Sequence, residues 1–189
     1  MRKLSGVALP GLLALALLPS LARADVKLPA VFNSHAVLQR DLPIPVWGWA
    51  DPHEEVRVQL AGRPVVKAKA GADGKWQVKL PPMPAGGPYT LRVGGKGSAP
   101  AYQTRRRNAA GEIELVPHPA KNLLTLEDIL IGEVWLCSGQ SNMEMVVNSC
   151  QNVDQEKAEA ANFPLIRHCR VTKDPEALAQ DDVKALWEV

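Results

Sequence analysis

The strongest constraint on the fold is a period-two alternation of apolar and polar residues between residues 25 and 102. It is clearest over 56–60, 76–80 and 89–93, and each of these tracts predicts a strand with one buried face. Asp73-Gly74 predicts a hairpin turn just before the second tract. With 16 prolines and 14 glycines, the chain is too rich in helix-breaking residues for a helical bundle. Short strands about every ten residues predict a small antiparallel β-sandwich, immunoglobulin-like or jelly-roll-like.

Two tryptophans in this region allow two interpretations. Trp47 and Trp49 lie two residues apart on an expected strand and should therefore point the same way. Their flat rings could stack on a sugar, but a sandwich also needs large apolar residues inside, and we favour the core. His35 and His53 lie beside expected turns, where we expect solvated side chains.

The first 24 residues have the layout of a secretory signal with cleavage after Ala24. Arg2 and Lys3 precede an apolar run over 7–18, and Ala22-Arg23-Ala24 is typical of a signal-peptidase site. The run is shorter than the roughly 20 residues that a membrane span needs. We therefore expect a periplasmic or secreted protein without membrane association after cleavage.

The charge balance gives no reason to expect a polyanionic partner. The chain has 22 basic and 20 acidic residues, and removal of the leader would leave 19 basic and 20 acidic ones. Apolar residues make up 46% and charged residues 22%, as in ordinary soluble globular proteins. We expect no nucleic-acid partner, and we interpret Arg105-Arg106-Arg107 as an exposed loop.

The cysteines are too few for a disulfide scaffold or a zinc cluster. Cys137, Cys150 and Cys169 would enter an oxidising compartment as an odd set, so that one stays unpaired or finds a partner elsewhere. The sequence does not choose a pair among them.

The pattern changes after a weakly patterned link over 94–122, in which 112–116 predicts one further strand. Residues 129–137 are almost continuously apolar, as in a parallel strand buried on both faces. A helix over 143–161 and a second strand over 165–171 complete an expected βαβ unit. The expected division is therefore a leader (1–24), a β-sandwich domain with its linker (25–122) and the first βαβ part of an α/β domain (123–189).

Ser141 is the candidate nucleophile. It follows the carboxyl end of the expected strand and lies near the start of the expected helix, where backbone N–H groups stabilise negative charge. Gly139 would allow a sharp turn, and the Ser141 N–H could donate to the oxyanion of a reacting ester. In the alternative interpretation, Ser141 caps the helix and Glu144 completes a capping box. The two roles are compatible.

The segment Val134-Trp135-Leu136-Cys137-Ser138-Gly139-Gln140-Ser141-Asn142-Met143-Glu144 resembles the nucleophile block of the sialate O-acetylesterase family, which belongs to the SGNH-type hydrolases. The resemblance covers nearly the whole mature chain and is weakest over 94–122. Further matching segments lie upstream: Leu28-Pro29, Val37-Leu38-Gln39-Arg40-Asp41, Val46-Trp47-Gly48-Trp49-Ala50, Gly74-Lys75-Trp76 and Gly87-Pro88-Tyr89-Thr90-Leu91.

The resemblance implies a secreted serine esterase that removes O-acetyl groups from sialic acids or related sugars. Ser141 matches the nucleophile, and Gln140 and Asn142 would border the substrate. The fold implied is a β-sandwich followed by the start of an α/β/α SGNH hydrolase domain with a parallel sheet, incomplete in this chain. The resemblance implies no metal and no organic cofactor. The acetylated sugar, the acetyl position and the oligomeric state stay open.

The general base is missing from the expected site. The family supplies it from an Asp-x-x-His element far downstream, and nothing after Ser141 has that form. His168 is the only downstream histidine and lies within an expected strand, which is unsuited to the role. We therefore expect the chain to be the amino-terminal part of a longer esterase, inactive by itself. The alternative is an exported, non-catalytic sugar-binding β-sandwich with a vestigial hydrolase tail.

Overall fold

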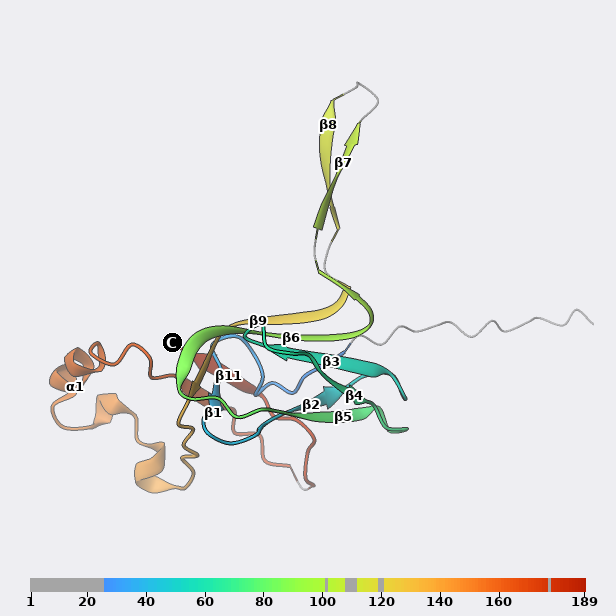
Figure 1. Ribbon diagram of the computed structural model, residues 1–189. Helices are drawn as coiled ribbons and strands as arrows, with labels where there is room; N and C mark the ends of the chain where they lie inside the picture. The colour runs from blue at the N-terminus through green and yellow to red at the C-terminus, as the bar shows by residue number, and fades with distance from the viewer. Residues whose placement is uncertain (1–25, 101, 108–111, 119–120, 177) are drawn as a thin grey trace, which may run out of the picture.

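The computed structural model describes residues 26–100, 102–107, 112–118, 121–176 and 178–189 (Figure 1). The expected leader lies outside the described residues. The strands are β1 (Val37–Gln39), β2 (Ile44–Trp49), β3 (Glu55–Leu60), β4 (Val66–Lys69), β5 (Lys75–Leu80), β6 (Gly86–Ala99), β7 (Tyr102–Arg107), β8 (Ile113–His118), β9 (Lys121–Gly132), β10 (His168–Val171) and β11 (Ala185–Glu188). The helices are the 3-10 turns η1 (Ser141–Glu144) and η2 (Val147–Ser149) and the α-helix α1 (Val153–Ala160).

Two sheets form the body of the molecule. One has five strands in the order β1-β9-β6-β3-β4, and the other pairs β2 with β5. In the larger sheet β1 runs parallel to β9, whereas the other pairs are antiparallel. The expectation of a purely antiparallel arrangement is therefore wrong. Alternation specifies which face of a strand is buried, and it does not specify the direction of strands that are distant in sequence.

The two sheets lie as two layers (Figure 1), and buried apolar side chains from both form one cluster. The three strands predicted by alternation are confirmed as β3, β5 and the early part of β6, and their alternate residues are buried. The smaller sheet contributes Ile44, Val46, Trp76, Val78 and Leu80 to this cluster, and the larger one contributes Val56, Val58, Leu60, Leu91, Val93, Ile129 and Ile131.

Trp47 does not lie in this core, contrary to the sequence expectation. In β2 the buried residues are Ile44 and Val46, and the side chain of Trp47 lies on the opposite face, 37% exposed. It packs edge-on against Phe32, with ring centroids 4.6 Å apart. The alternate residues of β2 that face the interior are branched or small. The two tryptophans lie at the other alternate positions, which face away from the core.

A buried polar cluster joins the turn before β3 to the start of β9. The Glu54 carboxylate accepts hydrogen bonds from the backbone N–H groups of Asp51 and Lys96 and from the Asn122 side-chain amide. The Asn122 side-chain oxygen in turn accepts the N–H of Val26 at 2.8 Å. Since Glu54 and Asn122 are both buried, these bonds satisfy polar groups that water does not reach.

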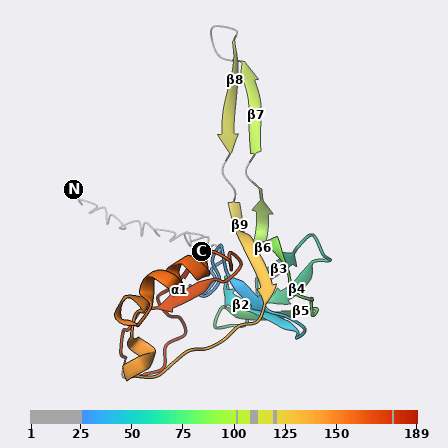
Figure 2. The same ribbon diagram turned by 90° about the vertical axis from the view of Figure 1, so that its left-hand side faces the viewer.

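The described residues of the link over 94–122 lie mostly in strands. β6 extends to Ala99, and β7 and β8 form an antiparallel hairpin that projects from the body (Figure 2). The strand expected at 112–116 is confirmed as part of β8. Arg105, Arg106 and Arg107 lie in β7, so the loop expectation for this cluster is wrong. In a hairpin of two strands, pairing between the strands keeps the backbone extended. Such a hairpin needs no buried face, so apolar alternation in the sequence does not reveal it.

The strand expected at 129–137 is confirmed only over 129–132, the end of β9, which pairs parallel with β1. β9 runs through the expected domain boundary after residue 122 and ends at Gly132. It pairs with both β1 and β6, so its apolar residues belong to the core of the sheets. Residues 133–139 lie outside any helix or strand. A short apolar run is compatible with any strand buried on both faces, and periodicity does not show which sheet contains it.

The helix expected over 143–161 is divided into η1, η2 and α1. The division follows the polar tract Asn148-Ser149-Cys150-Gln151-Asn152, because Asn and Ser favour caps and turns, and Asn152 adopts a left-handed conformation with φ 57°. The second expected strand is confirmed only over β10, which pairs antiparallel with β11. The described chain therefore contains no βαβ unit after residue 123.

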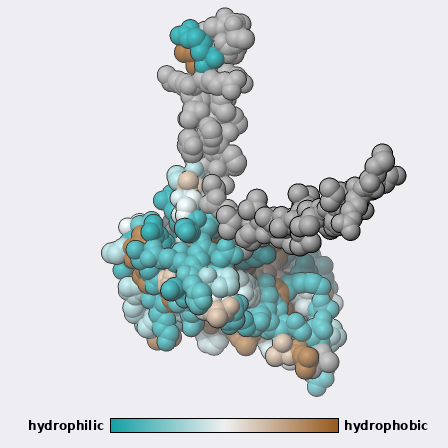
Figure 3. All heavy atoms as spheres, turned by 90° about the vertical axis from the view of Figure 1, so that its right-hand side faces the viewer, coloured by the Kyte–Doolittle hydropathy of each residue, from teal (hydrophilic) through white to brown (hydrophobic). Residues whose placement is uncertain are grey.

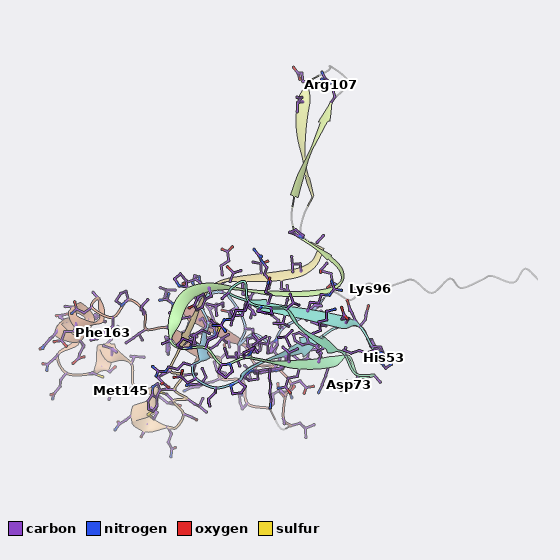
Figure 4. The ribbon with its side chains drawn as sticks, viewed as in Figure 1. His53, Asp73, Lys96, Arg107, Met145 and Phe163 are labelled. Atoms are coloured by element: carbon purple, nitrogen blue, oxygen red, sulfur yellow. The ribbon has the colours of Figure 1, made fainter. Side chains whose placement is uncertain are left out.

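No helix of the described part of the chain combines the length and the apolar character needed to cross a membrane. His53 and Asp73 lie at one end of the two sheets (Figure 4). The described surface at this end is mostly hydrophilic (Figure 3).

Candidate active site

Ser141 lies in a strained turn at the start of η1. Its φ is 59°, a left-handed value that non-glycine residues rarely adopt. Gln140 precedes it with an extended backbone, and the Gln140 carbonyl accepts the N–H of Met143 at 3.2 Å. Because Ser141 is the first residue of η1, it does not cap a long helix, and Gln140 occupies the cap position. The expected capping box and helix dipole at Ser141 are therefore wrong.

Gly139 makes this turn possible. Its φ is 151°, and a Cβ at this position would lie 2.9 Å from the Cγ atom of Met143. A side chain here would meet both backbone strain and a steric clash. The sequence expectation that Gly139 allows a sharp turn is confirmed. Strained backbone beside a nucleophile is a known way to present its hydroxyl group, and the turn has that character.

The segment that leads to Ser141 is tied to the sheet by the residues that follow β1. The Gln39 side chain accepts the N–H of Val134 at 3.0 Å and donates to the Glu133 carboxylate at 3.0 Å. The Arg40 guanidinium lies 3.4 Å from the same carboxylate, and its backbone N–H donates to the Gly132 carbonyl. Asp41 and Glu133 raise the pKa of Arg40 above its ordinary value. These contacts fix where the chain leaves β9.

His35, Asp128 and Arg167 form a second polar cluster, which the sequence analysis missed. His35 Nδ1 lies 2.7 Å from Asp128 Oδ2, and Arg167 Nη2 lies 3.1 Å from the same oxygen. His35 and Asp128 both have positive φ. The Arg167 side chain is 6% exposed, and its Nε has no hydrogen-bond partner in the described structure. The cluster fastens the segment after α1 to the sheet.

The pKa of Asp128 is lowered from its ordinary value, mainly by its hydrogen bond to His35 and then by the charge of Arg167, while burial opposes the shift. The contribution of Asp128 to stability is therefore present above its unfolded-state pKa and lost as the pH falls through the lower folded-state pKa. In Asp128→Asn, the free energy of unfolding should fall less steeply below about pH 4 than in the unchanged protein. Urea denaturation from neutral pH to about pH 3, followed by tryptophan fluorescence, measures the difference.

Asp181→Asn is the matched control, because Asp181 makes an exposed ion pair with Lys75 at 2.7 Å. Exposed pairs contribute little to stability, so this variant should keep the acid dependence of the unchanged protein. An acid dependence of Asp128→Asn equal to that of the unchanged protein would contradict the prediction.

The structure does not bring the other candidate residues to Ser141. In the described chain, no hydrogen bond joins the exposed Ser141 hydroxyl to another group, and Gln140 and Asn142 are exposed beside it. His168 begins β10, and its Nδ1 lies 3.7 Å from a Glu188 carboxylate oxygen. Met145, which follows η1, and Phe163 lie beyond one end of the sheets, and His53 and Asp73 lie at the other end (Figure 4).

The cysteines and the acidic residues form no metal site in the described structure. The thiols of Cys137, Cys150 and Cys169 are all free, and burial raises the pKa of the Cys169 thiol. The described residues include no cluster of three or more His, Cys, Asp or Glu side chains that could hold a metal ion.

Comparison with known proteins identifies relatives of this chain. No family model matches it. The chain is 30% identical to sialate O-acetylesterase of Pongo abelii, with 94% of this chain and 32% of the relative aligned. For the Homo sapiens protein of that name the identity is 30%, with 84% and 29% aligned, and for the Rattus norvegicus protein it is 32%, with 82% and 27% aligned. The crystal structure of a carbohydrate acetylesterase from Xanthomonas citri matches with a TM-score of 0.69 and 35% identity, over 86% of this chain and 32% of that one.

In fold, the chain is similar to a carbohydrate acetylesterase, the Xanthomonas citri protein. The chain is a homologue of the sialate O-acetylesterases over most of its length, and the resemblance seen in the sequence is confirmed. The chain spans about a third of the length of these curated relatives.

Proposed function

We propose that this chain is the amino-terminal part of a secreted serine esterase that removes O-acetyl groups from sialic acid or related acetylated sugars. The observation that carries the proposal is the strained turn at Ser141, where a non-glycine residue has φ 59°. Farther back along the chain, Gln39 and Arg40 hold the residues from Gly132 to Val134. The homologues support the reaction class, since they are named as esterases of acetylated sugars.

In the proposed mechanism, the Ser141 oxygen attacks the acetyl carbonyl carbon while a histidine takes its proton. The backbone N–H of Ser141 donates to the oxyanion, and Gln140 and Asn142 border the sugar. The bond from the carbonyl carbon to the sugar oxygen then breaks, and the histidine returns the proton to that oxygen. Water, deprotonated by the same histidine, hydrolyses the acetylated serine and releases acetate. We assign this histidine and its aspartate to positions beyond residue 189.

We also propose the finer organisation of the protein. Residues 1–24 form an export signal cleaved after Ala24, and the two sheets form a β-sandwich of immunoglobulin-like or jelly-roll-like type. The SGNH hydrolase part, expected from residue 123, begins after Gly132, because β9 belongs to the sheets.

The test uses the protein purified as its own gene expresses it, with an O-acetylated sialic acid as the substrate. We expect loss of the ester-linked acetyl group while the N-acetyl group of the same sugar persists, as followed by mass spectrometry. A fluorophosphonate should label Ser141 and leave Ser149 unlabelled. Labelling at another serine, or no release of acetate, would overturn the proposal.

A non-catalytic, sugar-binding module is the second candidate. It is favoured by two observations: no apolar residue is buried among the described residues from 133 onward, and no described base contacts Ser141. Sequencing the gene past codon 189 separates the two candidates. An in-frame Asp-x-x-His element supports the esterase, whereas a stop codon directly after Val189 supports the binding module.

A further inference from the structure

A hollow of about 340 Å³ opens on the outer face of the five-stranded sheet, where β3 and β6 pair. The residues around it come from the end of β3, the turn after it and the start of β6: Gln59, Ala61, Gly62, Pro88, Tyr89, Thr90 and Arg92. Its volume lies at the lower end of the range of about 300–1,000 Å³ for small-molecule sites, which suits one small ligand. No residue of the Ser141 turn lines it.

One wall of the hollow is a tight turn after β3 that main-chain hydrogen bonds hold. Ala61 and Gly62 both have positive φ, and the Arg63 N–H donates to the Leu60 carbonyl at 2.9 Å, which closes a tight turn. The Ala61 N–H donates to the Thr90 carbonyl at 3.0 Å and ties this turn to β6. Because main-chain hydrogen bonds hold the turn, its shape does not depend on mobile side chains.

An irregularity in β6 shapes the other side of the hollow. The pairing of β6 with β9 shifts register between Tyr89 and Leu91, and such a shift redirects side chains. Leu91 is fully buried, whereas the Tyr89 ring is only partly buried against the core and also borders the hollow. The ring therefore offers an apolar surface beside polar groups.

Arg92 gives the hollow its charge. It is exposed, and in the described structure no carboxylate lies within ion-pair distance of its guanidinium. The neighbouring Arg57 differs, because Glu55 neutralises it at 2.9 Å. Gln59, the cross-strand partner of Arg92, donates its amide to the Arg63 carbonyl, so that its own side-chain oxygen stays available as an acceptor. A guanidinium with two free N–H edges binds a carboxylate better than it binds a neutral group.

We propose that this hollow is an accessory binding site for a monosaccharide that has a carboxylate group, with Arg92 contacting the carboxylate and Gln59 and Thr90 contacting sugar hydroxyls. The choice of an acidic sugar rests on the proposed function, because sialic acids have such a group. The site would hold an acidic glycan outside the Ser141 turn.

The test is a titration of the isotope-labelled chain with N-acetylneuraminic acid, followed by the NMR signals of its backbone amides. This sugar has the carboxylate and no O-acetyl ester, so binding needs no turnover. We expect saturable shifts at Gln59, Thr90 and Arg92. Arg92→Gln should weaken binding at least about ten-fold, since a charge-assisted pair is lost. Lys79→Gln removes an exposed cation outside the hollow and should keep the affinity within about two-fold.

Three results would overturn the site: unchanged binding by a folded Arg92→Gln protein, equal binding of the methyl ester of the sugar, or equal binding of inorganic phosphate at the same amides. The accessory site and the esterase activity can also be disproved independently. Release of acetate without these amide shifts removes only the accessory site, and amide shifts without release of acetate remove only the esterase.

Discussion

Replacement of Ser141 by alanine should reduce the hydrolysis of an O-acetylated sugar at least about a thousand-fold in the protein expressed from its own gene. In the proposed mechanism, the acyl-enzyme forms on the Ser141 oxygen, and no other hydroxyl group lies in the described turn from Gly139 to Glu144. Alanine removes only that oxygen. The effect should therefore lie in kcat, because the substrate-binding surface beside the turn stays in place.

The measurement is release of acetate under steady-state conditions, with substrate varied to separate kcat from KM. Ser149→Ala is the matched control, since Ser149 is equally exposed at the end of η2 and should retain activity within about two-fold. Residual turnover in Ser141→Ala above about a tenth of the original rate would assign the nucleophile elsewhere.

Ile129→Ala should be strongly destabilising. Ile129 is fully buried in β9, whose backbone pairs with Tyr89 of β6, and its side chain belongs to the cluster between the two sheets. Removal of a buried isoleucine side chain beyond Cβ leaves a cavity in a close-packed core and costs about 2–5 kcal/mol. We expect a loss of this size in the free energy of unfolding by urea.

Two further variants sharpen this measurement. Ile129→Val should cost only about 0.5–1.5 kcal/mol, because one methyl group is lost. Ile166→Ala makes the same chemical change at a site that is 70% exposed, and it should change stability by less than about 0.5 kcal/mol. A small loss in Ile129→Ala would show that β9 is not part of the cooperative core.

The strands with the clearest alternation could be predicted from sequence because burial on one face leaves a local trace. Val56, Val58 and Leu60 alternate with polar neighbours, and in β3 they are buried as predicted. Trp47 shows the limit of the same argument. Alternation divides a strand into two faces, but which face meets the core depends on the opposite sheet, and β2 turns Ile44, Val46 and Gly48 inward.

Part of the candidate site could likewise be predicted from the sequence, and part could not. The Gly139–Met143 run was evident from its residues and its resemblance, and the positive φ values of Gly139 and Ser141 give it a physical basis. The long-range contacts at the end of β9, before this run, were not evident. Gln39 and Val134 are 95 residues apart, and His35 and Asp128 are 93 apart, so no local pattern relates them.

By itself, the sequence determined the β-rich character of residues 25–102, the faces of β3 and β5, and the resemblance of the segment around Ser141 to the sialate O-acetylesterases. These depend on interactions between residues near one another in the chain. Only the tertiary structure decided that the apolar run at residue 129 joins the sheet of β1 and β6, that the expected long helix breaks, and that an unpaired Arg92 faces a hollow. These depend on which distant segments pack together, because burial and charge pairing are properties of the folded chain.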